Sequence, residues 1–297
     1  MPKDAPPLES FEEASRQFVA ALRSDDPAVR EVALGEIPPM VDDEVARELF
    51  RFARDPERGE EERGEALIAL GPALAECHDE EAPDGTLEAP PPGTEDWWEL
   101  PLSSAGYREV HDELRRIYHD GSLPKLVRRR ALEAAVRAPR DWHREAAATA
   151  WGSGDPDWRV TAVFAMGHLS GFQDEIIEAF RKGEPPVREE AVRAAGRSAT
   201  GEVLADDLRA LAADPSADRD LRLAAIEALG ELRPEGSSEV LEELQDDRNR
   251  EIRAAAREAL EEVDFWEDLE AGDFEGDDLG DADFEDLEGL GGSEDDW

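Results

Sequence analysis

Short apolar patterns of nearly the same form recur along the chain. The stretch VREEAVRAAG (187–196) places apolar and small residues at spacings of three and four, which is the period of a helix with one buried face. Similar stretches are WRVTAVFAMG (158–167), LRLAAIEALG (221–230) and ERGEALIALG (62–71). No segment shows the strict alternation of apolar and polar residues that is typical of a strand. The pattern therefore predicts an all-α protein.

Each copy of the pattern carries an arginine at the same place. We call these residues the ladder arginines, and they are Arg30, Arg63, Arg128, Arg159, Arg188, Arg222 and Arg253. Successive ladder arginines are 29 to 34 residues apart, except for one gap of 65 residues. Self-similarity at a fixed period of about 30 residues is the signature of a solenoid, in which each unit packs only against its neighbours.

Each unit also contains signals for helix ends and for a second helix. Asp-Pro pairs beginning at Asp26, Asp55, Asp155 and Asp214 predict helix starts, because aspartate caps a helix N-terminus and proline suits the first turn. Gly71, Gly167, Gly196 and Gly230 stand where we expect left-handed C-terminal caps. Second helices with apolar spacings of three and four are predicted at 43–55, 107–120, 174–183, 203–214 and 238–247. An N-terminal helix precedes about seven such helix pairs.

Paired helices at this period resemble HEAT repeats, in particular the short bacterial type also called PBS-lyase HEAT-like repeats. The resemblance covers roughly residues 9–263, which we take as one solenoid domain, 1–263. It implies a right-handed α-solenoid whose second helices line the concave face. It also implies that each ladder arginine pairs with an acidic residue of an adjacent unit. The family includes scaffolds, lyases, hydroxylases and glycosylases, so the repeat alone does not define a function.

The charge of the chain excludes some partners. It has 76 acidic and 33 basic residues and a net charge of −43, which disfavours binding to nucleic acid or to anionic lipid. Only Lys3, Lys125 and Lys182 are lysines, and an acidic surface with few lysines is typical of proteins from salt-rich cytoplasms. The alternative is an acidic protein from an ordinary high-GC bacterium. With a single cysteine, no apolar leader and no run of 18 apolar residues, we expect a cytoplasmic protein without a membrane segment.

Candidate catalytic chemistry is sparse. The paired His-Glu motifs of HEAT-repeat hydroxylases are missing, and His78, His111 and His119 are interpreted as surface histidines. Cys77 lies beside acidic residues, which raise the pKa of a thiol and disfavour a nucleophile. We therefore expect no catalytic residue, metal ligand or cofactor. An enzyme or lyase subunit of the same repeat family remains the alternative.

An insertion at 77–104, rich in proline and acidic residues, interrupts the second unit and carries Trp97 and Trp98. Two interpretations are open. The tryptophans can pack on the solenoid, or they can form an aromatic binding surface together with Trp142 and Trp151, because tryptophan is favoured at interfaces.

The same region holds a basic cluster. Its members, all within 30 residues, are Arg115, Arg116, Lys125, Arg128, Arg129, Arg130, Arg137, Arg140 and Arg144. They are either solvated surface residues or a positive patch that attracts an acidic peptide. On the second interpretation Arg115, Arg116, Arg129, Arg130 and Arg140 are candidate partner-binding residues.

The C-terminal segment 264–297 contains 16 acidic residues and no basic one, which predicts a disordered tail. Three Asp-Phe…Leu motifs begin at Asp264, Asp273 and Asp283. Their candidate contact residues are Phe265, Phe274, Phe284, Leu287 and the terminal Trp297. The tail can be a solubilising segment, a ligand for another protein, a mask over the basic patch of its own chain, or a nucleic-acid mimic. The sequence favours a non-catalytic scaffold that binds another protein or a peptide.

The salt-rich interpretation gives a prediction about stability. If the acidic surface is adapted to salt, the melting temperature of the full chain falls as potassium chloride is lowered from 3 M to 0.1 M, because less salt screens the mutual repulsion of the carboxylates. Thermal unfolding followed by circular dichroism measures this. A melting temperature that does not change with salt would remove the interpretation.

Overall fold

The computed structural model describes residues 8–35, 41–79 and 101–271, and all regular structure in these ranges is helical. The helices are α1 (Leu8–Leu22), α2 (Pro27–Gly35), α3 (Asp43–Arg54), α4 (Glu60–Ile68), α5 (Gly71–Asp79), α6 (Ser104–His119), α7 (Lys125–Ala135), α8 (Asp141–Gly152), α9 (Pro156–Gly167), α10 (Gln173–Lys182), α11 (Pro185–Gly196), α12 (Thr200–Ala213), α13 (Arg219–Leu232), α14 (Ser237–Leu244) and α15 (Arg250–Ala271). The all-α prediction is confirmed, and the five predicted second helices correspond to α3, α6, α10, α12 and α14.

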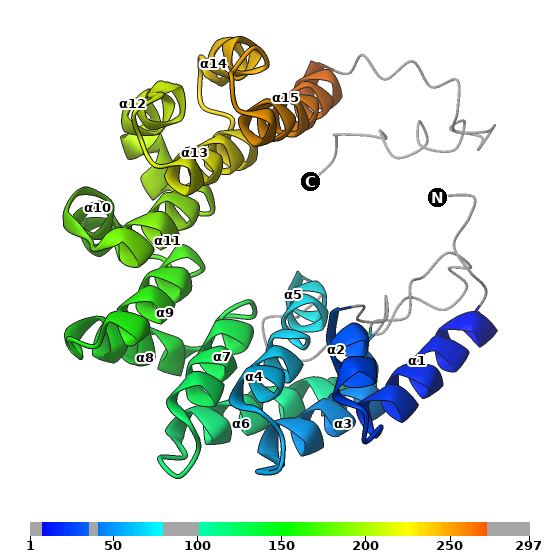
Figure 1. Cartoon of the computed structure of the whole chain (residues 1–297). Coiled ribbons are helices and arrows are strands. Elements are labelled where there is room, and N and C mark those ends of the chain that lie inside the picture. Colours follow the sequence, from blue (N-terminus) through cyan, green and yellow to red (C-terminus); the bar gives the residue numbers. More distant parts are fainter. Residues whose placement is uncertain (1–7, 36–40, 80–100, 272–297) are drawn as a thin grey trace, which may run out of the picture.

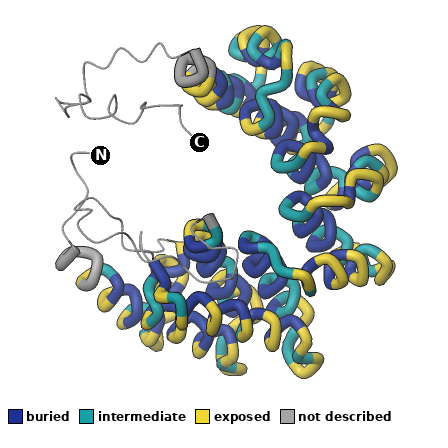
Figure 2. Tube along the Cα trace, turned by 180° about the vertical axis from the view of Figure 1, so that it is seen from behind, coloured by how far each residue is buried: buried dark blue, intermediate teal, exposed yellow. Residues whose placement is uncertain are grey.

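The helices form two rows along an open arc (Figure 1). We define the inner row as the helices that carry the ladder arginines, namely α2, α4, α7, α9, α11, α13 and α15. The outer row consists of α3, α6, α8, α10, α12 and α14. The inner row faces the hollow of the arc and the outer row forms its convex side, where many of the exposed residues lie (Figures 1 and 2). This corrects our expectation that the second helices line the concave face.

Close contact between small residues holds the inner row together. A Cβ added at Gly167 would lie 3.1 Å from Ala194 Cα, and one added at Gly230 would lie 3.0 Å from Ala259 Cβ. At Gly196 the added Cβ would be 2.8 Å from Ala228 Cα. None of these glycines has a positive φ, so the predicted left-handed caps are wrong. Glycine recurs there because the next inner helix leaves no room for a side chain.

The Asp-Pro pairs have two different roles. Asp155 caps α9 as predicted, with its carboxylate accepting the backbone N–H groups of Asp157 and Trp158. Asp26 accepts the N–H of Ala28 at the start of α2. Asp55 and Asp214 instead follow α3 and α12 as C-terminal caps. The prediction was wrong at these two positions, because an aspartate bonded to an N–H two residues ahead also makes a tight turn.

Three ladder arginines connect an outer helix to the inner helix that follows it. Arg63 Nε donates to the carbonyl of Ala53 at 2.7 Å, and Arg128 Nε donates to that of Tyr118 at 2.9 Å. Arg222 Nε donates to the carbonyl of Ala212 at 2.9 Å. Each acceptor is the penultimate residue of an outer helix and stands ten residues before its arginine. A guanidinium at this place satisfies a carbonyl that has no partner within its own helix and interacts favourably with the negative end of the helix dipole.

The remaining ladder contacts vary from unit to unit. Arg30 and Arg222 also reach an acid of the following unit, Glu62 at 3.0 Å and Asp247 at 2.7 Å. Arg159 and Arg188 lie over aromatic rings near the end of the preceding outer helix, Trp151 at 4.7 Å and Phe180 at 5.9 Å. Arg253 donates to the carbonyls of Asp247 and Arg248. The acid pairing that the family resemblance implies therefore accounts for only part of the ladder.

Two expected boundaries differ from the structure. Cys77 and His78, which we assigned to the insertion 77–104, lie inside α5, and Ser104 begins α6. At the other end α15 continues to Ala271, past the start of the predicted tail at Asp264.

The close packing of the inner row gives a prediction about stability. We expect Gly196→Ala to lower the free energy of unfolding by about 1–3 kcal/mol, because the added methyl group would overlap the backbone of Ala228. Urea unfolding measures the change. Gly152→Ala is the matched control, since a Cβ at the end of α8 meets nothing within 4 Å. Equal unfolding midpoints for the two variants would contradict this account of the glycine positions.

Candidate functional site

A groove lies between α6 and α8 on the outer row. Its main part has a volume of about 580 Å³ and is lined by Arg108, His111, Asp112, Arg115, Arg140, Asp141, Trp142 and Glu145. An adjoining hollow of about 390 Å³ shares Arg115, Trp142 and Glu145 with it and adds Tyr118, His119, Arg128, Ala146 and Thr149. We call the two together the α6–α8 groove. Among our candidate residues it brings together Arg115, Arg140 and Trp142.

Aromatic rings form one wall of this groove. The half-buried Trp142 lies 5.4 Å from Tyr118 and 4.1 Å from His143, measured between ring centroids. Tyr118 also packs edge-on against Trp158 at 6.0 Å. In a chain with only 6% aromatic residues, this concentration provides an apolar contact surface beside charged side chains.

Charged side chains of both signs surround the rings. Arg108 and Arg115 are exposed, and among the described residues neither makes a hydrogen bond or an ion pair. Arg140 lies over the ring of Tyr107 at 5.4 Å. The carboxylates of Asp112, Asp141 and Glu145 line the same groove. The guanidinium groups of Arg108 and Arg115 are thus available to bind a ligand. The neighbouring carboxylates can accept hydrogen bonds from N–H groups of the same ligand.

His143 lies fully buried behind Trp142 and completes the cap of α8. Its Nδ1 accepts the backbone N–H of Arg140 at 2.9 Å. Burial, with smaller contributions from His111, Arg140 and Arg115, lowers the pKa of His143 to about 3. The ring is therefore neutral in the folded protein, and the positive charges that surround it belong to the groove.

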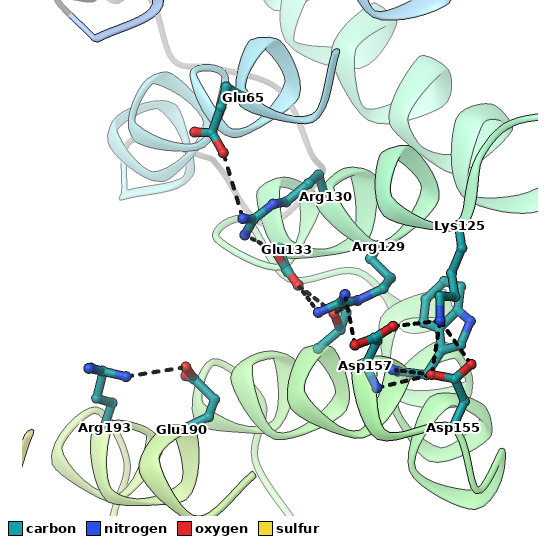
Figure 3. Close-up of polar contacts among 11 residues, drawn as sticks. Glu65, Lys125, Arg129, Arg130, Glu133, Asp155, Asp157, Glu190 and Arg193 are labelled. Carbon is teal, nitrogen blue, oxygen red and sulfur yellow. Dashed lines mark hydrogen bonds and ion pairs between the residues drawn. The ribbon is translucent and has the colours of Figure 1, made fainter. Parts of the chain in front are cut away.

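Two of the other candidate arginines, Arg129 and Arg130, form ion pairs on the inner row (Figure 3). The guanidinium of Arg130 forms ion pairs with Glu65 of α4, at 3.6 Å, and with Glu133, at 2.7 Å. Arg129 donates to Thr161 of α9 at 2.9 Å, and Thr161 in turn donates to Glu133. Glu133 is only 4% exposed. This network joins α4, α7 and α9 across the insertion, so Arg129 and Arg130 serve packing between units.

The remaining candidates are placed apart from the groove. Arg116 pairs with Glu113 at 2.8 Å, and Trp151 lies under Arg159. Phe265 is 50% exposed on α15, next to Trp266, which contacts Arg233 at 4.9 Å. Trp97, Trp98, Phe274, Phe284, Leu287 and Trp297 lie outside the described residues.

Two residues considered for catalysis, Cys77 and His111, are buried. Cys77 is fully buried, and this burial raises the pKa of its thiol to about 11, which opposes formation of a thiolate. His111 is buried beside Tyr107, so interpreting it as a surface residue was wrong. Within the described ranges no group of three or more His, Cys, Asp or Glu side chains could hold a metal ion. Nor does any helix in those ranges have the length and apolar character needed to cross a membrane.

Sequence reasoning missed Arg108 and Tyr118. Arg108 precedes Arg115 by seven residues, which places both on one face of a helix. That spacing was readable, but Arg108 falls outside the dense part of the basic cluster. Tyr118 carried no signal, because its role depends on the packing of α6 against α8 and α9.

Stacked pairs of helices with a repeated arginine define an α-solenoid. The family model for HEAT repeats matches residues 173–261, from α10 into α15, and confirms the predicted resemblance to HEAT repeats over that stretch. A comparison with curated proteins finds no match.

Similar solved structures include an engineered protein with 18% identity and a TM-score of 0.34, covering 85% of this chain and 97% of that one. Another is a designed armadillo repeat protein in complex with the peptide (KR)4, with 17% identity, a TM-score of 0.28 and coverage of 83% and 98%. Similarities this low carry no argument about binding.

The buried His143 predicts a specific dependence of stability on pH. Its pKa is about 3 in the folded protein and about 6.5 in the unfolded chain, so the unfolded chain alone takes up a proton below pH 6.5. Each pH unit below this value costs the native protein about 1.4 kcal/mol. We expect the stability of the wild type relative to His143→Asn to fall by about 2 kcal/mol between pH 7 and pH 5. Urea unfolding at both pH values tests this, and a constant difference would contradict it.

Proposed function

We propose that this protein is a non-catalytic scaffold that binds a segment of another protein in the α6–α8 groove. The observation that carries the proposal is the pair of exposed guanidinium groups of Arg108 and Arg115 beside the Trp142 ring. In a chain of net charge −43, arginines without acid partners stand out from the paired arginines of the inner row. A rigid helix pair that presents such groups is a suitable platform for a peptide.

The chemistry of the groove defines the partner. Carboxylates of the partner would receive charge-assisted hydrogen bonds from Arg108 and Arg115. An aromatic or aliphatic side chain next to them would pack on Trp142 and Tyr118. The acids of the groove disfavour a purely anionic ligand such as nucleic acid, because like charges placed next to one another repel. The preferred ligand is therefore a protein segment in which acidic residues flank an apolar one.

Binding of a synthetic peptide tests this function. The probe is a fluorescein-labelled ten-residue peptide of aspartate, glutamate and two phenylalanines, titrated with the full chain and followed by anisotropy. We expect Arg108→Ala and Arg115→Ala each to weaken binding about tenfold, which corresponds to about 1.4 kcal/mol. Both side chains are exposed, so their replacement leaves the core intact.

Two controls make the result specific. Arg181→Ala removes an exposed arginine of the outer row that pairs with Asp207 outside the groove, and it should leave affinity unchanged. A peptide with asparagine and glutamine in place of the acids should bind weakly. Equal affinity for the two peptides, or equal losses in all three variants, would reject the proposed site.

A further inference from the structure

The surface of the inner row changes its chemistry along the arc. Residues five and nine positions after each ladder arginine stand one helical turn apart on the same face. In α13 and α15 these positions hold only glutamates, Glu227, Glu231, Glu258 and Glu262, which line a groove of about 400 Å³. At or just beyond the ends of α7, α9 and α11 the ninth positions hold Arg137, His168 and Arg197 instead.

The three basic residues gather around one ring. Arg137 lies 5.8 Å from the centroid of the Phe164 ring and Arg197 lies 5.2 Å from it, while His168 contacts the ring at 5.0 Å. We call this group the Phe164 clamp. It is built from residues of three successive units, so it exists only in the assembled solenoid.

Several side-chain nitrogen atoms of the clamp have no hydrogen-bond partner among the described residues. Arg137 is half-buried, its stem lies over Gly71, and within the described part of the chain it makes no hydrogen bond or ion pair. Arg197 pairs with Glu190 at 2.8 Å, yet its buried Nε has no partner. The buried Nε2 of His168 also has none. A guanidinium half-removed from water without a partner is costly, and a carboxylate ligand would offset that cost.

The pKa values of the clamp residues reflect their burial and the closeness of their positive charges. Burial lowers the pKa of Arg137, and the nearby Arg197 lowers it further. Burial lowers the pKa of His168 to about 4, with additional contributions from Arg197 and Arg137. Burial is the larger cause of both shifts, and the smaller contributions of the neighbouring arginines show that positive charges face one another at the clamp.

We propose that the Phe164 clamp binds the C-terminal segment 272–297 of the same chain. That segment carries 12 acidic residues and no basic one. The glutamate-lined groove of α13 and α15 repels it, whereas the clamp, farther along the inner row, groups two arginines and a histidine around one ring. The Asp-Phe motifs at 273–274 and 283–284 supply a carboxylate for Arg137 beside a ring that can pack near Phe164.

The length of the segment suits an intramolecular contact. Neighbouring helices lie about 8–10 Å apart, so the clamp at α9 and α11 is roughly 16–30 Å from α15. The segment has 26 residues, and a random coil of that length has a root-mean-square span of roughly 26–31 Å. Effective concentration is highest when these two lengths match. Helices α6 and α8, whose residues line the α6–α8 groove, lie farther from α15 along the arc and belong to the outer row (Figure 1).

Zero-length cross-linking in the full chain tests the contact. The variants Arg137→Lys and Arg197→Lys place an amine at the clamp that a carbodiimide can couple to a carboxylate. We expect digestion and mass spectrometry to find position 137 or 197 joined to an acid of 272–297, in a product that migrates as a monomer. Lys125, which lies 3.1 Å from Asp155, is the internal positive control.

Arg181→Lys on the outer row is the matched negative control, because it should couple to Asp207 and not to the C-terminal segment. Dimeric products alone would show that a second copy supplies the ligand and would overturn the proposal. Equal coupling of the segment to positions 137 and 181 would overturn it as well.

A second readout covers the case of an unreactive amine. In the ¹⁵N-labelled full chain, the double change Arg137→Gln and Arg197→Gln should shift the amide signals of residues 272–297, whereas Arg181→Gln should not. Unshifted signals together with no cross-link to the segment reject the proposal. Neither measurement depends on the α6–α8 groove having a partner.

Discussion

The close approach of the inner-row helices is the constraint on which the rest of this structure depends. Where Gly196 meets Ala228 and Gly230 meets Ala259, only a backbone with minimal side chains fits between consecutive units. Outer helices carry larger residues and are spaced more widely, so the stack curves toward the inner row (Figure 1). The same constraint leaves no room for an aromatic ring at these closest contacts. The rings that wall the α6–α8 groove lie on the convex side, and the ring of Phe164 lies where arginines of the neighbouring units reach it.

The fold could be predicted from the sequence because its unit is local and repeated. The period of the ladder arginines and the apolar spacings identified both helices of most units without any long-range information. The errors arose where one local sequence serves two structures. Asp55 and Asp155 are both followed by proline, yet Asp155 caps the helix that begins there and Asp55 ends the helix before it. A glycine at the end of a helix equally fits a left-handed cap or a close packing contact, and the neighbouring helix decides between them.

The candidate site was predictable in composition but not in arrangement. Sequence alone marked Arg115, Arg140 and Trp142, which do share a groove, together with Arg129 and Arg130, which do not. The basic cluster spans the end of one unit and the start of the next, so the two rows divide it between opposite faces. On the inner row Arg129 and Arg130 reach Asp157, Glu65 and Glu133, whereas on the outer row Arg140 lies over the ring of Tyr107. Whether an arginine is paired depends on contacts between neighbouring units, and the sequence of a single repeat does not determine those contacts.

The large negative charge makes unpaired arginines informative. A chain with more than twice as many acids as bases offers many carboxylates to a guanidinium, and Arg130, Arg193 and Arg197 of the inner row are paired in this way. Arg108, Arg115 and Arg137 are positioned where the chain's own helices bring no acid into contact with them. Two of them face outward in a groove, and one lies half-buried beside Phe164 on the inner row. Because these positions lie on opposite rows, a ligand on one leaves the other accessible. The solenoid can therefore hold its own acidic segment and an acidic partner at the same time, and the two contacts are expected to influence each other only through the charge of the whole chain.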